Sequence, residues 1–175
     1  MMGIDCIEGN KIFLRPMRAD DTEDILKWRN NPSVVRRFIY REPVTEADHL
    51  KWIREKVETG LVRQFIITVR ESGRGIGSVY LQKIDMEKKT AEFGIFIGED
   101  DEHGKGYGTE AQQLIIRYAF EELGLNMLTL RVLEDNLAAR TAYEKNGWVS
   151  VPGDFGSVMS EGKEIRILAM EKTNG

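Results

Sequence analysis

A glycine-rich turn between a predicted strand and a predicted helix constrains the fold of this chain more than any other sequence feature. The turn comprises His103, Gly104, Lys105, Gly106, Tyr107, Gly108 and Thr109. Its glycines let the backbone adopt positive φ and bring N–H groups close to a ligand. The following helix places unpaired N–H donors and the positive end of its dipole at the same point, which favours a bound phosphate. Lys105 would add a positive charge, and a plain flexible turn is the alternative interpretation.

The turn matches neither of two common phosphate-binding motifs. A Walker P-loop ends in Gly-Lys-Ser/Thr, which this turn lacks. A dinucleotide-binding turn has its third glycine at another offset and lies beside the first strand of its domain. The spacing therefore indicates a different kind of phosphate site.

The spacing of apolar residues predicts seven strands and four helices. Strands are expected at residues 11–15, 64–69, 76–81, 90–97, 127–133, 148–151 and 164–170. Helices are expected after Asp20 or Asp21, after the capping box Thr45 to Asp48, after the glycine turn, and at residues 137–146 behind Asn136. Residues 152–162 are expected to be a turn-rich link. This order mixes hairpins with crossovers, so we expect an α/β (α+β) fold with a mixed, mostly antiparallel sheet flanked by helices.

Bulk properties limit the class of protein. The chain has 175 residues, 41% of them hydrophobic and 31% charged, which fits a single domain over residues 1–175. A net charge of −4 gives no general attraction for nucleic acid, and no run of 18 apolar residues predicts a membrane span. Cys6 is the only cysteine, and residues 1–6 do not resemble a signal peptide. We therefore expect a cytoplasmic protein.

Two segments resemble the motifs of the GCN5-related N-acetyltransferase (GNAT) superfamily. Gly106 and Gly108 stand at the glycine positions of its motif Gln/Arg-x-x-Gly-x-Gly/Ala. Asn136-x-x-Ala139-x-x-x-Tyr143-x-x-x-Gly147-Trp148 is similar to a second motif that normally ends in Gly-Phe. The predicted element order matches the family fold from residue 11 to residue 170. Residues 28–30 and 91–95 resemble the branch that contains ribosomal-protein N-terminal, spermidine and amino-sugar acetyltransferases.

The resemblance implies transfer of an acetyl group from acetyl-CoA to a primary amine, by direct attack in a ternary complex. In this family the pantetheine pairs with the fourth strand, which would place the thioester beside Phe96, Ile97 and Gly98. A backbone N–H there would stabilise the developing negative charge on the carbonyl oxygen. Asn136 is expected to cap its helix and to contact the cofactor. His103 departs from the motif because it occupies the Gln/Arg position, and its single donor predicts weaker or more pH-sensitive cofactor binding.

Tyr143 is the candidate acid that protonates the leaving thiolate, because a tyrosine is protonated at neutral pH. An aromatic residue on the core face of a short helix is the alternative. Glu92 is the candidate general base or water holder. It lies opposite the apolar face of a strand that should be buried on both sides, where a carboxylate needs a partner or a water. A surface glutamate at an edge is the alternative for Glu92.

The segment between the first two helices is the candidate acceptor site. It holds four arginines and no acidic residue, and the residues singled out are Trp28, Arg29, Arg36, Arg37, Tyr40 and Arg41. Arginine suits an anionic acceptor, so an amino-sugar nucleotide or a peptide N-terminus flanked by acids is favoured over spermidine. A solvated turn with internal salt bridges is the alternative.

Several further possibilities stay open or are set aside. A ribosomal-protein or peptide N-terminal acetyltransferase is one alternative function, and a non-catalytic acyl-CoA-binding module is another. His49 stands without a second histidine or a cysteine nearby, so no metal site is expected. The sequence does not fix the oligomeric state, and a homodimer is one of the options.

Overall fold

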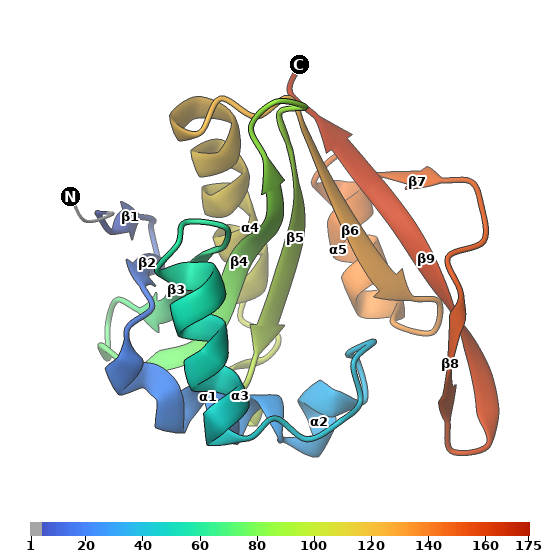
Figure 1. Ribbon diagram of the computed structural model, residues 1–175, viewed down its shortest axis with the longest axis horizontal. Helices are drawn as coiled ribbons and strands as arrows, with labels where there is room; N and C mark the ends of the chain where they lie inside the picture. Colours follow the sequence, from blue (N-terminus) through green and yellow to red (C-terminus); the bar gives the residue numbers. More distant parts are fainter. Residues whose placement is uncertain (1–4) are drawn as a thin grey trace.

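The computed structural model describes residues 5–175, and its strands form a strongly twisted sheet (Figure 1). In spatial order the strands are β1 (Ile7–Glu8), β2 (Ile12–Pro16), β3 (Arg63–Val69), β4 (Gly75–Asp85), β5 (Thr90–Ile97), β6 (Met127–Leu133), β9 (Lys163–Thr173) and β7 (Val149–Val151). β8 (Ser157–Ser160) pairs with β9. The strand pairs are antiparallel apart from β5 with β6, which is parallel. The mixed, mostly antiparallel sheet is confirmed.

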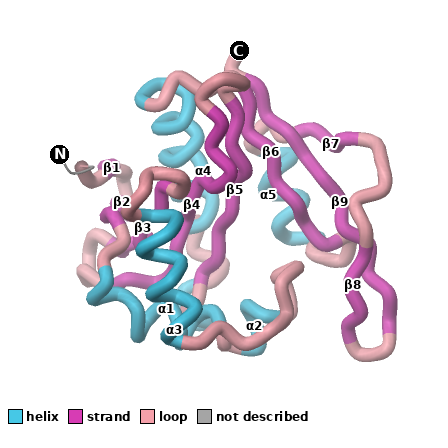
Figure 2. The backbone as a smooth tube through the Cα atoms, in the orientation of Figure 1, coloured by secondary structure: helices cyan, strands magenta, loops and turns pink. Residues whose placement is uncertain are grey.

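Helices cover both faces of the sheet (Figures 1 and 2). α1 (Thr22–Arg29), α2 (Pro32–Val35) and α3 (Glu46–Trp52) pack on one face, around a core that includes Trp28, Ile66 and Phe96. α4 (Tyr107–Arg117) and α5 (Leu137–Lys145) pack on the other face, around a larger core. The alternation of β5 explains this division, because Phe93 contributes to the larger core and Phe96 to the smaller one.

The expected helix caps are formed in two of three cases. The Thr45 hydroxyl accepts from the Asp48 N–H and the Asp48 carboxylate accepts from the Thr45 N–H, both at 3.1 Å. Asn136 accepts from the N–H of Ala139 at 3.4 Å. Asp21 precedes α1 without a side-chain cap bond, because its carboxylate instead accepts from Arg15 and from the N–H of Arg18, both at 2.7 Å.

Two short strands and one short α-helix, among other short elements, were not expected from the sequence. β1 has two residues and β8 lies inside the segment expected to be a link, where its mixed polar composition gives no clear alternation. α2 begins at Pro32, which was expected only to end α1. Proline at the first helical position loses no hydrogen bond, and the Asn31 side chain accepts from Ser33 N at 3.2 Å. The β8–β9 hairpin extends from the body of the fold (Figure 1).

Residues 1–4, part of the segment in which no signal peptide was expected, lie outside the described residues. Within the described part, no helix combines the length and apolar character needed to span a bilayer.

Candidate active site

The sheet opens between β5 and β6, and this opening creates the site. The parallel pairing joins Thr90 to Met127, Ala91 to Leu128 and Glu92 to Thr129, and goes no further. Beyond Glu92 the two strands diverge, β5 staying with β4 and β6 staying with β9 (Figure 1). The end of β5 therefore presents an unpaired backbone edge to the opening.

The hydrogen-bond phase of β5 determines which of its N–H groups face the opening. Gly98 N donates to Ile76 O on β4 at 2.7 Å. Because N–H groups of successive strand residues point to opposite sides, the N–H groups of Ile95 and Ile97 point away from β4 and toward the opening. The N–H of Gly98, in contrast, is already bonded. The N–H groups of Ile97 and Ile95, and not that of Gly98, are therefore the ones that face the opening.

A cavity of about 1040 Å³ fills the opening and continues over the face that carries α1 to α3. It is lined by most of the residues singled out from the sequence: Arg29, Arg37, Tyr40, Glu92, Phe96, Ile97, His103, Gly104, Gly106, Tyr107, Gly108, Thr109, Asn136 and Tyr143. Gly98, Lys105, Trp28, Arg36 and Arg41 are not among its lining residues. The structure therefore brings the two sequence motifs and part of the arginine segment to one cavity.

The glycine turn has the positive φ that its sequence predicts at Gly104 and Gly106, whereas Gly108 lies inside α4 without a positive φ. Gly104 has φ +77° and Gly106 has φ +84°, and Gly106 is the N-cap of α4. A Cβ at either position would meet no atom within 4 Å, so the left-handed backbone, and not crowding inside the protein, requires glycine. Lys105 forms an ion pair with Glu102 at 3.2 Å. Its charge is therefore partly balanced within the turn.

α5 brings Asn136 and Tyr143 to the cavity wall. Tyr143 is 9% exposed, and its ring packs edge-on against Phe93 with 6.0 Å between ring centroids. Burial raises the pKa of Tyr143 well above its ordinary value. The hydroxyl therefore stays protonated throughout the neutral range, where it is available as a hydrogen-bond donor.

Glu92 is a half-buried residue held by three donors. Its carboxylate accepts from Gln82 at 3.0 Å, from Lys83 at 3.3 Å and from Arg131 at 3.2 Å. The partners required for a carboxylate in this strand therefore come from β4 and β6. A carboxylate offers about four acceptor positions, so roughly one is left for a water or a ligand.

Trp28 and Gly98 have a structural role next to the cavity. Trp28 is 1% exposed, and a Cβ on Gly98 would lie 2.1 Å from its Cγ atom. Glu99, which follows, accepts from Trp28 Nε1 at 3.0 Å, Lys27 Nζ at 2.9 Å and Arg74 at 2.8 Å. These contacts hold α1 against the segment that leads into the glycine turn.

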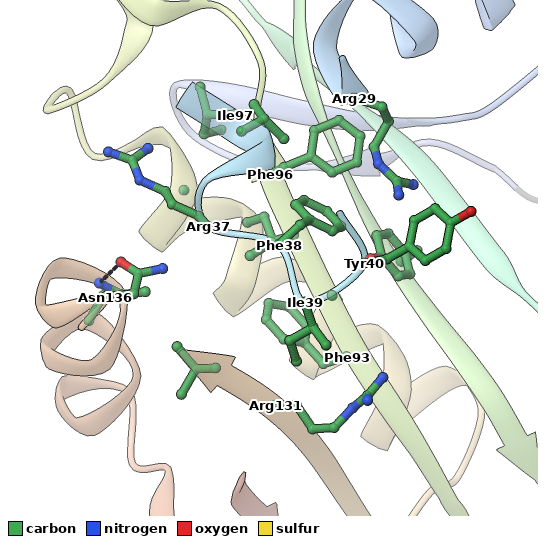
Figure 3. A pocket seen from close by; sticks show the side chains of 18 of the residues that line it. Arg29, Arg37, Phe38, Ile39, Tyr40, Phe93, Phe96, Ile97, Arg131 and Asn136 are labelled. Carbon is green, nitrogen blue, oxygen red and sulfur yellow. Dashed lines mark hydrogen bonds between the residues drawn. The ribbon is translucent and has the colours of Figure 1, made fainter. Parts of the chain in front are cut away.

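The arginines of the candidate acceptor segment divide into two groups. Arg29 and Arg37 line the cavity, whereas Arg41 donates to Arg36 O at 3.0 Å and to Ser160 at 3.3 Å. The contacts of Arg41 link the segment to the β8–β9 hairpin, away from the cavity. Figure 3 shows Arg37 and Asn136 on one side of the cavity and Arg29, Tyr40 and Arg131 on the other.

The cavity lining also includes residues that the sequence did not single out, among them His49, Tyr80, Ile95 and Arg131. His49 was considered only as a metal ligand. Arg131 approaches Glu92 only because β6 pairs with β5, and the role of the Ile95 N–H depends on the hydrogen-bond phase. Among residues 5–175, no group of three or more His, Cys, Asp or Glu side chains is placed to hold a metal ion.

Comparison with known proteins identifies the domain. A family model described as "Acetyltransferase (GNAT) domain" matches residues 11–149. The chain is 36% identical over 152 residues to the putative ribosomal N-acetyltransferase YdaF of Bacillus subtilis, covering 82% of this chain and 81% of that protein. It is 27% identical over 130 residues to the acetyltransferase PseH of Campylobacter jejuni, covering 74% and 78%.

Two further matches differ in coverage. The spermidine N-acetyltransferase from Vibrio cholerae, solved in complex with CoA and spermine, superimposes with a TM-score of 0.86 at 22% identity, covering 94% of this chain and 96% of that one. The chain is also 28% identical over 144 residues to protein MJ1062 of Methanocaldococcus jannaschii, which covers 81% of this chain. The matched region spans only 28% of the length of that protein.

Proposed function

The chain belongs to the acetyltransferase (GNAT) family and is an acetyl-CoA-dependent N-acetyltransferase, and we propose that its acceptor is a primary amine with a negatively charged group. Amino-sugar nucleotides and peptide N-termini next to acidic residues have this chemistry. One observation carries the proposal: the cavity arginines Arg29 and Arg37 form no ion pair within the described residues, whereas Glu92 and Glu102 are each held by two cations.

The residues present fit acetyl-CoA. Gly104 and Gly106 have left-handed backbones with open space beside them, at the N-terminus of a helix of 11 residues. The unpaired N–H groups of Ile95 and Ile97 are suited to the amide and carbonyl groups of an extended ligand. Acetyl-CoA, when bound, supplies an activated acetyl thioester. We therefore assign the glycine turn and His103 to its phosphates, and the end of β5 and Asn136 to its pantetheine.

The contacts of the cavity residues support a chemical role for each of them. With acetyl-CoA bound, the N–H of Ile97 or Ile95 would donate to the thioester carbonyl oxygen and would stabilise the negative charge that develops there. Tyr143 is placed to donate a hydrogen bond to the departing sulfur, because it lines the cavity and stays protonated. The Glu92 carboxylate already accepts from three donors, so its remaining acceptor position can hold one water. We propose that this water accepts the proton of the amine.

The charge of the cavity also affects the acceptor amine. Positive side chains near an amine disfavour its protonated form, which cannot attack. An α-amine is roughly one-tenth neutral at pH 7, whereas a lysine-like amine needs about 3.5 kcal/mol more from the site. Because Arg29 and Arg37 have no ion-pair partner among residues 5–175, a polyamine is a poor fit and an anionic amine a good one.

An acceptor panel tests the proposal. Acetyl-CoA is incubated with amino-sugar nucleotides, with peptides that differ in acidic residues near the N-terminus, and with polyamines. Thiol release and the product mass are measured. We expect the highest kcat/KM for an anionic acceptor and a decline with added salt, since exposed charges are screened within about 8–10 Å. Spermidine as the best acceptor would refute this proposal, and cofactor binding with no thiol release for any amine would favour the non-catalytic module.

The cellular location belongs to the same proposal. Cys6 is exposed and is the only cysteine, so it cannot form an internal disulfide. A reducing compartment with abundant acetyl-CoA suits both the free thiol and the reaction. We infer a cytoplasmic enzyme, which fractionation of cells that express the protein would test.

A further inference from the structure

The acceptor side of the cavity holds an arginine whose charge is not balanced by the protein. Arg29 is the last residue of α1, and its guanidinium lies over the Phe38 ring at 4.5 Å and at 5.9 Å from the Phe96 centroid. Within residues 5–175, no carboxylate pairs with this guanidinium and no acceptor receives a hydrogen bond from it. Burial lowers the pKa of Arg29 from its ordinary value, which shows that the surroundings disfavour its charge.

A second polar group in the same region also lacks a partner. His49 of α3 is 5% exposed and lines the cavity, and its buried Nε2 atom has no hydrogen-bond partner in the described chain. Burial and the charge of Arg29 both lower the pKa of His49, which favours the neutral imidazole. A buried polar atom without a partner is costly, and such atoms in native proteins mark strain or a binding role. The neutral ring has one N–H to offer.

The neighbouring acidic groups are engaged elsewhere. Asp48 accepts from the N–H of Thr45 in the helix cap, and Glu92 is held by Gln82, Lys83 and Arg131. Arg29 and His49 therefore form a pair of donors with one positive charge, surrounded by aromatic residues. A bound anion would balance the charge of Arg29 and would accept a hydrogen bond from His49.

We propose that Arg29 and His49 form a subsite that binds a carboxylate of the acceptor amine. This inference rests on the proposed function, which it narrows to one anion class. A carboxylate is planar, matches the fork of donors on a guanidinium, and carries the single charge that Arg29 balances. A phosphate monoester carries up to two charges, and the second would lie unpaired near Asp48 and Glu92. Among the acceptors considered above, the subsite favours those with acidic residues.

Matched acceptors test the subsite directly. A series of ω-amino acids of increasing length, from glycine to 6-aminohexanoate, is compared with the corresponding amides and with ω-aminoalkyl phosphates of equal length. For the wild-type enzyme, we expect kcat/KM for the best carboxylate to exceed that of its amide by about ten- to hundred-fold, the usual strength of a charge-assisted bond. The phosphate should fall between them. A phosphate preferred over the carboxylate would overturn the assignment.

Variants separate this subsite from other sources of anion preference. The ratio of kcat/KM for the acid to kcat/KM for its amide should fall to near one in Arg29→Gln, with an unchanged KM for acetyl-CoA. Arg29→Lys should retain part of this preference for the acid. His49→Gln should reduce it by a smaller factor. Arg54→Gln is the matched control, because Arg54 is an exposed arginine outside the cavity and should leave the ratio unchanged.

A stability measurement distinguishes ligand binding from a structural role. Removing an unpaired, largely buried charge should leave the Tm of ligand-free Arg29→Gln equal to that of the wild type or raise it, whereas a structural role predicts a lower Tm. With CoA present, N-acetyl-6-aminohexanoate should raise the Tm of the wild type more than the corresponding amide does. For Arg29→Gln, the acid and the amide should raise the Tm equally. If the wild type prefers amides or spermidine, the proposed function fails; if it prefers acids and Arg29→Gln does so equally, this inference alone fails.

Discussion

Glu99 connects the fold to the site, and replacing it with glutamine tests that connection. The carboxylate is 8% exposed and lies between Gly98 and the glycine turn. It accepts from Trp28 Nε1 at 3.0 Å, from Lys27 at 2.9 Å and from Arg74 at 2.8 Å. Glutamine keeps the shape and the acceptor for Trp28, but it removes the charge and replaces one acceptor atom with a donor that faces cations.

The size of the effect follows from these contacts. A charge-assisted hydrogen bond contributes about 1.5–3 kcal/mol, and the loss of a partner from a fully buried ion pair costs about 3–5 kcal/mol. Lys27 is 64% exposed and Arg74 is 41% exposed, so both cations regain water, and Arg74 keeps Asp101 and Glu102. We therefore expect Glu99→Gln to lower the free energy of unfolding by about 2–3 kcal/mol, or the Tm by about 4–12 °C at this chain length.

The pH dependence identifies the charge as the cause. Hydrogen bonds from Lys27 and Trp28 outweigh desolvation and hold the pKa of Glu99 below its ordinary value. A carboxylate with a lowered pKa adds stability that is complete above its unfolded-state pKa, about 4.3, and is lost as the pH falls through the folded-state pKa. The Tm difference between wild type and variant should therefore be full at pH 7 and shrink below about pH 4.

Thermal unfolding at pH 7 and at pH 3–4 is the assay, with Asp101→Asn as the matched control. Asp101 also pairs with Arg74, at 3.1 Å, but it is 69% exposed and should change stability little. Because Glu99 holds the start of the glycine turn, Glu99→Gln should also weaken acetyl-CoA binding. Equal Tm differences at both pH values, or equal effects of the two substitutions, would refute the reasoning.

Three further substitutions test individual parts of the site. Tyr143→Phe should lower kcat by roughly 10²–10⁴-fold with little change in acetyl-CoA affinity, measured by steady-state kinetics and calorimetry; an unchanged kcat would make Tyr143 a packing residue. Gly106→Val should abolish the rise in Tm that acetyl-CoA causes, since a β-branched residue is strained at φ +84°; a full-sized shift would rule out the phosphate assignment. Gly98→Ala should displace Trp28, whose Cγ lies 2.1 Å from the new Cβ, and so raise the acceptor KM through movement of α1; normal kinetics and Tm would show that the helix adjusts freely.

Strong local patterns made much of the fold predictable. β5 and β6 have the predicted bounds of residues 90–97 and 127–133, because buried strands in the middle of a sheet carry long apolar patterns. The Thr45–Asp48 capping box and the left-handed glycines at 104 and 106 also follow from local chemistry. β8 has no such pattern, since it is half polar and is held by pairing with β9. Its existence depends on a partner rather than on its own sequence.

The local conformation of the glycine turn was more predictable than the composition of the rest of the cavity wall, for a physical reason. Phosphate binding uses backbone N–H groups and left-handed glycines, which leave a local mark on the sequence. The proposed acceptor side is lined by side chains of α1, α3, β4 and β6, which approach one another only in the folded chain. Even the arginine segment, whose composition indicated an anion site, gave no sign of which arginines reach the cavity.

Arg29 and His49 show what the structure adds to that composition. In the sequence Arg29 is one of four arginines and His49 an isolated histidine. In the fold, α1 and α3 pack side by side, and both side chains enter one cavity without partners from residues 5–175. The carboxylates that would neutralise Arg29 are bound by other cations or helix caps, so the folded chain keeps one positive charge available. Under the proposed function, an anionic acceptor would balance this charge, so the packing of α1 against α3 would determine which acceptor the enzyme prefers.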